Sequence, residues 1–263
     1  MLSKNVAKYI NSLQIKKFRQ QHGQFVVEGA KSVFEVLASD YEVQTVISTP
    51  DFLEKNHEFL RAFAVQIEIT TADELAKIGS FQTNKTCLAV VSTKENVFLC
   101  AQGQELVLVL DDIRDPGNLG TILRVADWYG IKKVICSTTT TDLYNPKVIA
   151  ASKGSFCRVQ VYYCDLPAFF ETNSCPIYGA VLAGQSVYET VFKQTASYLL
   201  LGNEANGVSQ VLNQLISHPI TIPRAGGAES LNVGIATAVL LDNWHRQMLA
   251  LDGKIIQTRR TPQ

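Results

Sequence analysis

Polar side chains that could take part in a reaction are concentrated in three segments of the sequence, each of which includes or directly follows an apolar run. The segments are "DPGNLGTILRVADWYGI" at residues 115–131, "LLLGNEANGVSQ" and "ITIPRAGGAESLNVGIATAVLL". The candidate site residues that we select from them are one arginine, one carboxylate, two amides and one hydroxyl, namely Arg124, Glu204, Asn118, Asn232 and Ser230. Since this set contains no cysteine or histidine, it favours a reaction that needs orientation and proton transfer over metal or thiol chemistry.

Packing does not account for Arg124. Leu119, Ile122 and Ala126 recur at helical spacing and form the packed face of the helix predicted after the first loop, and Arg124 lies outside that face. A surface pair with Asp127 is the structural alternative, and such pairs add little stability. Arg124 is therefore the residue of this helix that most needs a functional explanation.

Helix capping offers a structural explanation for most of the other candidates. Asn118 is placed as the N-cap of the helix that carries Arg124, and Ser230 as the N-cap of the last helix. Glu204 could also serve a helix end. Asn232 has no such explanation, because it would lie just inside an otherwise apolar helix.

The glycines of the first loop suggest a nucleotide-binding site but do not fit one closely. Gly117 and Gly120 give the spacing G-x-x-G, whereas the dinucleotide-binding fingerprint is G-x-G-x-x-G. Asp142, which follows the next predicted strand, stands where the ribose-binding acid of that fold would be expected. Without the additional glycine, the pattern argues against a dinucleotide cofactor.

The elements around these loops predict an α/β fold with a parallel sheet. Six short, mostly apolar strands are predicted in the second half, at residues 106–110, 132–137, 158–162, 177–182, 198–202 and 219–222. Helices fall between most of them, and the last helix covers residues 231–249. Continuously apolar strands are typical of a parallel sheet covered by helices on both faces. The three loops would then converge at one edge of the sheet, where such folds bind their ligands.

The first half predicts a separate small α/β domain. Residues 5–23 have a helical pattern that Gly23 would end, and strands are predicted at 24–29, 43–49, 65–70 and 86–93. Thr71 and Glu74 have the spacing of a capping box at the start of a helix. We therefore expect domains at residues 1–95 and 105–263, joined by a linker at 96–104.

Composition limits the class of protein. The chain has 263 residues, of which 46% are apolar and 18% charged, as in globular proteins. The apolar runs are too short to span a bilayer, and the N-terminus lacks the apolar core of a signal peptide. The six cysteines form no C-x-x-C pair and have no histidine at zinc spacing. These features predict a cytoplasmic protein with reduced thiols, no metal site and no membrane association.

Charge is unevenly distributed although the net charge is zero. The first 31 residues carry six basic side chains and a single acid, and the C-terminal tail adds further lysine and arginine. Such a cluster is typical of a surface that contacts phosphates, although a solvated helix face gives the same pattern. The candidate RNA contacts in this cluster are Lys16, Lys17 and Arg19.

The three segments, in this order and spacing, resemble the signature motifs of the SpoU (TrmH-like) RNA ribose methyltransferases, members of the SPOUT superfamily. The intervening "DLYNPKVIAASKGSFCRV" is also similar to that family. "KKFRQQHGQFVVEGAKSVFEVL" resembles the family's substrate-binding domain, which is related to ribosomal kink-turn-binding proteins. One departure is "TNKTCLAVV", where many relatives carry Pro-Gln-Gly, and it concerns only the N-terminal domain.

The resemblance implies transfer of a methyl group from S-adenosylmethionine to a ribose 2′-hydroxyl of RNA. It also implies a deep trefoil knot near the C-terminus and a homodimer, for which the apolar last helix is a candidate interface. Arg124 matches the catalytic arginine, with Asn118, Glu204, Ser230 and Asn232 around it. The implied cofactor contacts are Gly202, Asn203, Ile222 and Leu231, with Ala183 and Gly184 as weaker candidates.

The resemblance leaves the RNA open. An N-terminal domain of this type favours ribosomal RNA, and transfer RNA is the alternative. Two other functions remain to be weighed: a non-catalytic RNA-binding factor, against which the intact residues of all three motifs argue, and a SPOUT enzyme that methylates a base. The arginine in the first motif and "SLNV" in the third favour the ribose-methylating branch.

Overall fold

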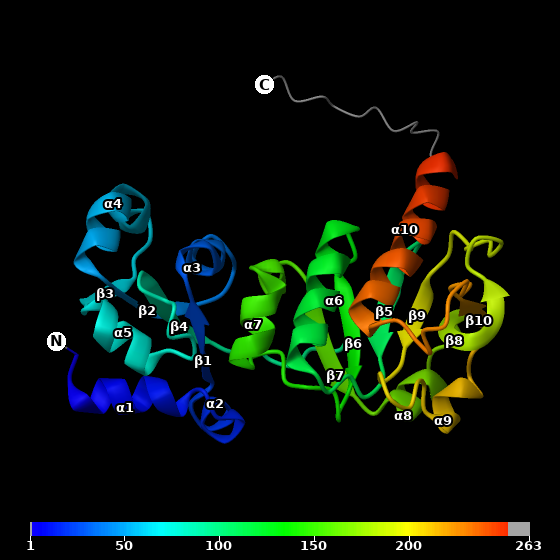
Figure 1. Cartoon of the computed structure of the whole chain (residues 1–263), viewed down its shortest axis with the longest axis horizontal. Helices are drawn as coiled ribbons and strands as arrows, with labels where there is room; N and C mark the ends of the chain where they lie inside the picture. The colour runs from blue at the N-terminus through cyan, green and yellow to red at the C-terminus, as the bar shows by residue number, and fades with distance from the viewer. Residues whose placement is uncertain (1, 252–263) are drawn as a thin grey trace. The chain divides into compact units, whose positions relative to one another are not determined.

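The computed structural model describes residues 2–251, which form two compact units (Figure 1). The first unit holds residues 2–97, 115–124 and 141–160, and the second holds 98–114, 125–140 and the described residues from 161 onward. Helix α6 (Pro116–Trp128) contributes its first part to one unit and its last turn to the other. No helix among residues 2–251 is both long and apolar enough to cross a bilayer.

The first unit is built on a four-stranded mixed sheet. Its strands, in spatial order, are β1 (Gln24–Glu28), β4 (Cys87–Ser92), β2 (Val43–Ser48) and β3 (Gln66–Ile69). Strand β4 is antiparallel to both neighbours, and β3 is parallel to β2. All four strands were predicted from the sequence, because each combines an apolar run or strict alternation with a following turn.

Seven helical segments belong entirely to the first unit. They are α1 (Lys4–Ser12), α2 (Lys16–His22), α3 (Ala30–Leu37), α4 (Pro50–Arg61), α5 (Ala72–Ile78), α7 (Pro146–Ser152) and the short 3₁₀ helix η1 (Ser155–Cys157). Gly23 ends α2 with φ of 63°, as predicted. The Thr71 hydroxyl accepts a hydrogen bond from the Glu74 amide at 3.2 Å, which confirms the predicted cap of α5.

The N-terminal helix is interrupted, contrary to the sequence prediction of one helix over residues 5–23. Helix α1 ends at Ser12, and Leu13 turns into the core, where it is fully buried. Helix α2 then restarts at Lys16. Burial of one leucine thus outweighs the helical propensity of the segment, as tertiary contacts commonly do.

Residues 141–160 pack against the N-terminal sheet. The Phe25 ring on β1 lies 4.5 Å from that of Tyr144 and 6.0 Å from that of Phe156, measured between centroids. Arg158 forms an ion pair with Glu35 of α3. Sequence patterns did not indicate this packing, because the partners lie more than a hundred residues apart.

The second unit contains a six-stranded sheet. Its spatial order is β10 (His218–Thr221), β8 (Ile177–Ser186), β9 (Ser197–Leu201), β5 (Leu106–Leu110), β6 (Lys133–Ser137) and β7 (Gln160–Cys164). The pairs from β10 to β6 are all parallel, which confirms the predicted sheet type. Every residue of β5 and β9 is buried, so both faces of the central strands are covered.

In the described part of the second unit, three further helices are present: α8 (Leu166–Glu171), α9 (Gln210–Asn213) and α10 (Val233–Leu251). Helices α8 and α9 share one hydrophobic core with β5, β6 and β9. Helix α10 contacts the region after α6, where the Tyr129 hydroxyl lies 3.3 Å from the Asp242 carboxylate. These contacts fix the sheet whose carboxyl edge carries the candidate site.

Candidate active site

The loops singled out in the sequence follow β5, β9 and β10 of the second sheet. Because these strands are parallel, their carboxyl ends meet at one edge, together with the end of β8. Strand β9 lies between β5 and β8, so the loops after β5 and β9 are neighbours. The predicted convergence of the loops of this unit at one sheet edge is therefore confirmed.

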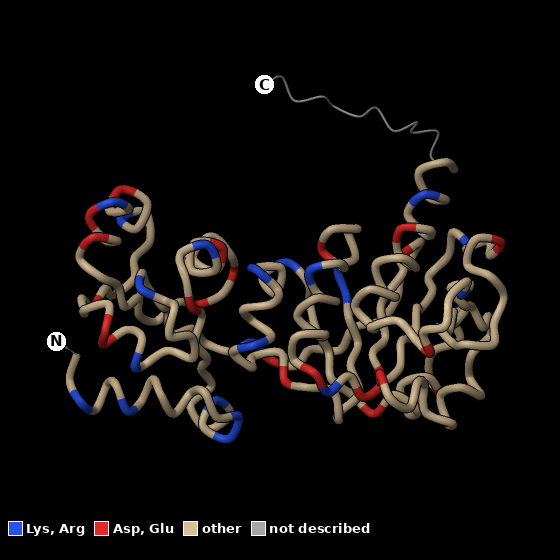
Figure 2. Tube along the Cα trace, in the orientation of Figure 1, with Lys and Arg blue, Asp and Glu red and all other residues tan. Residues whose placement is uncertain are grey.

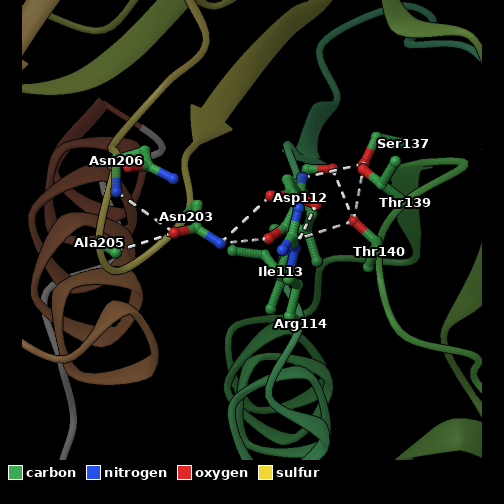
Figure 3. Close-up of polar contacts among 10 residues, drawn as sticks. Asp112, Ile113, Arg114, Ser137, Thr139, Thr140, Asn203, Ala205 and Asn206 are labelled. Atoms are coloured by element: carbon green, nitrogen blue, oxygen red, sulfur yellow. Dashed lines mark hydrogen bonds and ion pairs between the residues drawn. The ribbon is translucent and has the colours of Figure 1, made fainter.

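The loop after β5 is pinned by hydrogen bonds to the end of β6 (Figure 3). The Asp112 amide donates to Ser137 Oγ at 2.9 Å, and the Ile113 amide donates to Thr140 Oγ1 at 3.2 Å. Arg114 Nε donates to Asp112 Oδ1 at 3.0 Å. The hydrogen bond from Arg114 lowers the pKa of the Asp112 carboxyl below its usual value, so the carboxylate is charged at neutral pH.

Helix α6 starts from an aspartate and not from the predicted asparagine. The Asp115 carboxylate accepts a hydrogen bond from the Asn118 amide at 2.9 Å, and the Asp115 carbonyl accepts one from Leu119. The prediction that Asn118 is the N-cap is therefore wrong. Asn118 lies inside the first turn with a half-buried side chain, so N-capping does not explain it.

Arg124 lies on the exposed side of α6, as predicted. Leu119, Ile122, Leu123 and Ala126 are all fully buried, whereas Arg124 is exposed. The packed face therefore excludes Arg124. Both Asn118 and Arg124 lie on the part of α6 that belongs to the first unit.

The loop after β9 is a tight turn organised by Asn203. Its backbone amide and carbonyl exchange hydrogen bonds with Gly207 at 2.9 and 2.8 Å. Its side-chain Oδ1 accepts hydrogen bonds from the amides of Ala205 at 2.9 Å and Asn206 at 3.3 Å. The turn leaves Glu204 exposed at its tip.

Gly202 is required by the same turn. A Cβ atom at Gly202 would lie 2.1 Å from the carbonyl carbon of Gly207 and 2.2 Å from the amide nitrogen of Val208. No side chain can be accommodated at that distance. The close approach of the backbone at Gly207 and Val208 thus explains why glycine occupies this predicted cofactor position.

Three hydrogen bonds connect the loops after β5 and β9, and Figure 3 shows the two from Asn203. Asn203 Nδ2 donates to the Asp112 carbonyl at 2.8 Å and lies 3.4 Å from Asp112 Oδ2. The Ser209 amide donates to the buried Asp111 carboxylate at 2.8 Å. Asp111 and Asp112 did not stand out in the sequence, because an acid after a strand usually serves a local turn.

The loop after β10 reaches the last helix through Asn232 and not through Ser230. Asn232 Oδ1 accepts hydrogen bonds from the amides of Gly234 at 3.0 Å and Ile235 at 3.3 Å, so Asn232 is the N-cap of α10. The prediction that Ser230 is the cap and that Asn232 lies inside the helix is wrong by two residues. Ser230 lies in the exposed loop before α10 and does not cap that helix.

The residues predicted to hold a cofactor lie at or after the ends of strands in this sheet, and exposed leucines are among or next to them. Ala183 and Gly184 lie near the end of β8, Ile222 follows β10, and Leu231 precedes α10. Leu231 is 49% exposed and Leu182, next to Ala183, is 81% exposed. Exposed leucines beside backbone-rich turns fit a ligand with a flat apolar ring and polar groups that main-chain atoms can bind.

The prediction that Arg19 contacts RNA is wrong, because its side chain is buried. Its guanidinium is buried, where Nη2 lies 2.6 Å from Asp142 Oδ2 and Nη1 donates to the carbonyls of Leu13 and Gln14. Lys16 and Lys17 are exposed on α2, and Figure 2 shows the basic residues along α1 and α2. Asp142, considered above as a ribose-binding acid, is the ion-pair partner of Arg19.

The described residues include no cluster of metal-ligating side chains, and the buried Cys87 is not an activated thiol. No cluster of three or more His, Cys, Asp or Glu side chains among residues 2–251 is placed to hold a metal ion. The six cysteines are free thiols, and burial raises the pKa of Cys87 to about 12. A thiol with such a pKa stays protonated at neutral pH and is a poor nucleophile.

Comparison with known families gives two matches that together cover most of the chain. Residues 105–242 match the SpoU rRNA Methylase family, and residues 4–96 match the MRM3-like substrate binding domain. The first match contains all three loops described above.

Individual relatives agree with these matches. The 23S rRNA (guanosine(2553)-2'-O)-methyltransferase RlmP of Bacillus subtilis is 29% identical over 87% of this chain and 91% of its own length. An uncharacterized tRNA/rRNA methyltransferase of Synechocystis is 31% identical, over 93% of this chain and 92% of its own.

A solved structure shares the fold over nearly the whole length. The AdoMet-bound rRNA methyltransferase from Sinorhizobium meliloti superimposes with a TM-score of 0.85 at 26% identity, covering 95% of this chain and 97% of that one. Because the family model matches more than half of the sequence and includes every loop of the candidate site, the chain belongs to the SpoU rRNA methylase family.

Proposed function

We propose that this chain transfers a methyl group from S-adenosylmethionine to a ribose 2′-hydroxyl of ribosomal RNA. The observation that carries the proposal is the tight turn after β9, which is bonded to the loop that leads into α6 and exposes Glu204. The names of the relatives favour ribosomal RNA as the substrate. Membership of the family adds the reaction class.

The residues at the sheet edge fit S-adenosylmethionine. The turn at Gly202 and Asn203, the segment at Ile222 and Leu231, and the end of β8 at Ala183 and Gly184 would hold it, mainly through backbone groups. The cofactor supplies a methyl group that is already activated on a sulfonium. The chain therefore has to bind RNA, orient the 2′-hydroxyl and remove its proton, and none of these tasks requires a metal ion.

Arg124 is the residue we assign to the 2′-hydroxyl. Its guanidinium, with a pKa above roughly 12, is a poor general base. It is well suited to donate a hydrogen bond that orients the hydroxyl and stabilises the negative charge that develops on its oxygen. The proton would leave to water, to an RNA phosphate or to the carboxylate of Glu204. Asn118, Ser230 and Asn232 would complete the ribose site.

The N-terminal part, which we place at residues 1–95 with a linker at 96–104, would bind the RNA substrate. Lys16 and Lys17 are exposed on α2 and would contact phosphates. The domain at 105–263 would carry the reaction and, as in its family, a trefoil knot at its C-terminal end. Free cysteines are typical of the cytoplasm, where we place the protein.

A homodimer is the assembly that the exposed apolar residues support. Trp128, at the end of α6, is 84% exposed, and Ile235, on α10, is 53% exposed. Large apolar side chains at such exposure commonly mark an interface between subunits. We propose that α10 contributes to the contact between the two copies.

The proposal is tested by incubating the purified chain with methyl-labelled S-adenosylmethionine and either ribosomal or transfer RNA. We expect labelled 2′-O-methyl groups in ribosomal RNA that lacks its natural modifications, and none with Arg124→Ala. Calorimetry of S-adenosylmethionine binding is the companion measurement. No affinity for S-adenosylmethionine would overturn the proposal in favour of a non-catalytic RNA-binding factor, and label in a base would assign the other SPOUT branch.

A further inference from the structure

Asp112 adopts a backbone conformation that is unusual for its residue type. Its φ is 57°, and among the described residues only one other non-glycine residue, Lys153 with φ of 52°, has a positive φ. Residues with a Cβ pay a steric cost for this conformation, although aspartate tolerates it better than most. Such a residue persists where the surrounding structure fixes it, which occurs most often near functional sites.

The groups of Asp112 connect the ends of three parallel strands. Its amide donates to Ser137 at the end of β6, its carbonyl accepts from Asn203 after β9, and Asp112 itself follows β5. Its carboxylate accepts from Arg114 and lies near Asn203 Nδ2. Figure 3 shows Asp112 between Asn203 on one side and Ser137 and Thr140 on the other.

Asn203 uses its side chain entirely within the protein. Its Oδ1 accepts the two amide hydrogen bonds that shape the Glu204 turn, while its Nδ2 donates to Asp112. A single amide group therefore fixes the turn and bonds it to the loop before α6. This gives the Asn203 side chain a positioning role, while its backbone remains at the predicted cofactor site.

We propose that Asp112 and Asn203 are positioning residues of the methyl-transfer reaction. Their hydrogen bond sets where the Glu204 turn lies relative to the segment that leads into the helix of Asn118 and Arg124. The inference rests on the proposed function. Positioning matters for such a reaction because a misplacement of about 1 Å between reacting groups can lower a rate on the order of 10²-fold. It adds two residues to the site that act through others.

The substitution that isolates this bond is Asn203→Asp. Aspartate keeps the oxygen that accepts from Ala205 and Asn206, but it loses the donor to Asp112 and places a second carboxylate beside it. We expect the single-turnover methyl-transfer rate to fall about 10²-fold, in line with the cost of misplaced reacting groups. The dissociation constant for S-adenosylmethionine should change by less than about threefold, because the reacting groups move while the backbone at the cofactor positions is retained.

The double variant Asp112→Asn with Asn203→Asp restores a donor opposite a carboxylate between the two side chains, which lie 3.4 Å apart in the original chain, but not the bond to the backbone carbonyl of residue 112. We expect its single-turnover rate to be about tenfold higher than that of Asn203→Asp, because the effects of substitutions at interacting residues are non-additive in a double-mutant cycle. Asp112→Asn alone should lower the rate less than Asn203→Asp does, because the backbone carbonyl of residue 112 still accepts from Asn203 and asparagine also tolerates a positive φ. If the fold-changes in rate caused by the two single substitutions simply multiply in the double variant, the proposal is overturned.

Lys153 provides a matched control for backbone conformation. Lys153→Ala and Asp112→Ala both place alanine at a positive φ, so both should lower the melting temperature. Only Asp112→Ala should lower the single-turnover rate of the folded protein. Equal rates for these two variants would contradict the proposal, as would an Asn203→Asp variant whose rate falls only because it no longer binds S-adenosylmethionine.

The unsubstituted chain is the reference that separates the proposed methyl-transfer function from the positioning role of Asp112 and Asn203. If it transfers no methyl group to any ribosomal RNA, the proposed function fails. If it transfers the methyl group and Asn203→Asp has the same rate, the function stands and the positioning role is rejected.

Discussion

The guanidinium of Arg19 and the carboxylate of Asp142 form a buried ion pair, with 2.6 Å between Nη2 and Oδ2. The side chain of Arg19 is only 4% exposed and that of Asp142 18%. Arg19 also donates to two backbone carbonyls at the break between α1 and α2. This residue therefore joins the N-terminal helices to the segment that follows β6, and it does so in place of contacting RNA.

Arg19→Ala should destabilise the protein strongly. Removing one partner leaves the Asp142 carboxylate and two carbonyls without their donor, and breaking a buried pair costs about 3–5 kcal/mol. Urea denaturation measures the change in the free energy of unfolding. Lys16→Ala, on the exposed side of the same helix, is the matched control and should change that free energy by less than about 0.5 kcal/mol. Equal stability of the two variants would show that the ion pair is not structural.

Lys16 and Lys17 should affect RNA affinity and leave stability unchanged. If both contact phosphates, replacing them with alanine removes about two counterion-releasing contacts and lowers the salt dependence of log K by roughly that number. Filter binding of ribosomal RNA fragments at several salt concentrations measures the slope. An unchanged slope would move the RNA-binding surface away from α2.

Much of the fold could be predicted because strands and packed helix faces leave a periodic signal. The parallel sheet followed from apolar runs such as residues 106–110, and the exposed position of Arg124 followed from the helical spacing of its neighbours. Helix ends were less predictable. The caps proved to be Asp115 and Asn232 instead of Asn118 and Ser230, because several polar residues near each end could accept the same amides.

Contacts between distant residues could not be predicted at all. Asn203 and Asp112 are separated by 91 positions, and Arg19 and Asp142 by 123. Each pair depends on where the fold brings two loops, and neither residue type nor spacing reports this. The sequence could therefore name the polar loops of the site, but not the hydrogen bonds that hold them together.

Gly202→Ala should abolish S-adenosylmethionine binding in a protein that still folds. The added Cβ would overlap the backbone of Gly207 and Val208, so the turn has to open. Calorimetry measures the binding, and circular dichroism checks the fold. Gly226 is the control for stability, because a Cβ there meets no heavy atom within 4 Å and Gly226→Ala should melt at the same temperature. Retained cofactor affinity in Gly202→Ala would remove this turn from the cofactor site.

The ionisation of Asp112 should make the stability of the protein depend on pH in the acid range. The hydrogen bond from Arg114 lowers the pKa of the Asp112 carboxyl in the folded protein below its unfolded value. The contribution of the Asp112 carboxylate to the free energy of unfolding is therefore present at neutral pH. It is lost as the pH falls through the pKa that this group has in the folded protein. The difference in unfolding free energy between the original chain and Asp112→Asn, measured from neutral to acid pH, should shrink with falling pH. A difference that stays constant would contradict this assignment.

The most direct test of the account is the single-turnover methyl-transfer rate of Arg124→Lys on its ribosomal RNA substrate. Lysine keeps the positive charge but loses the planar donor geometry of the guanidinium. We predict a fall of at least about 10²-fold, the usual cost of losing an oriented donor to a developing oxyanion. Affinity for RNA and for S-adenosylmethionine should be unchanged, and Arg61→Lys, on the exposed side of α4, should keep the full rate. A near-full rate in Arg124→Lys with binding intact would contradict a specific role for the guanidinium.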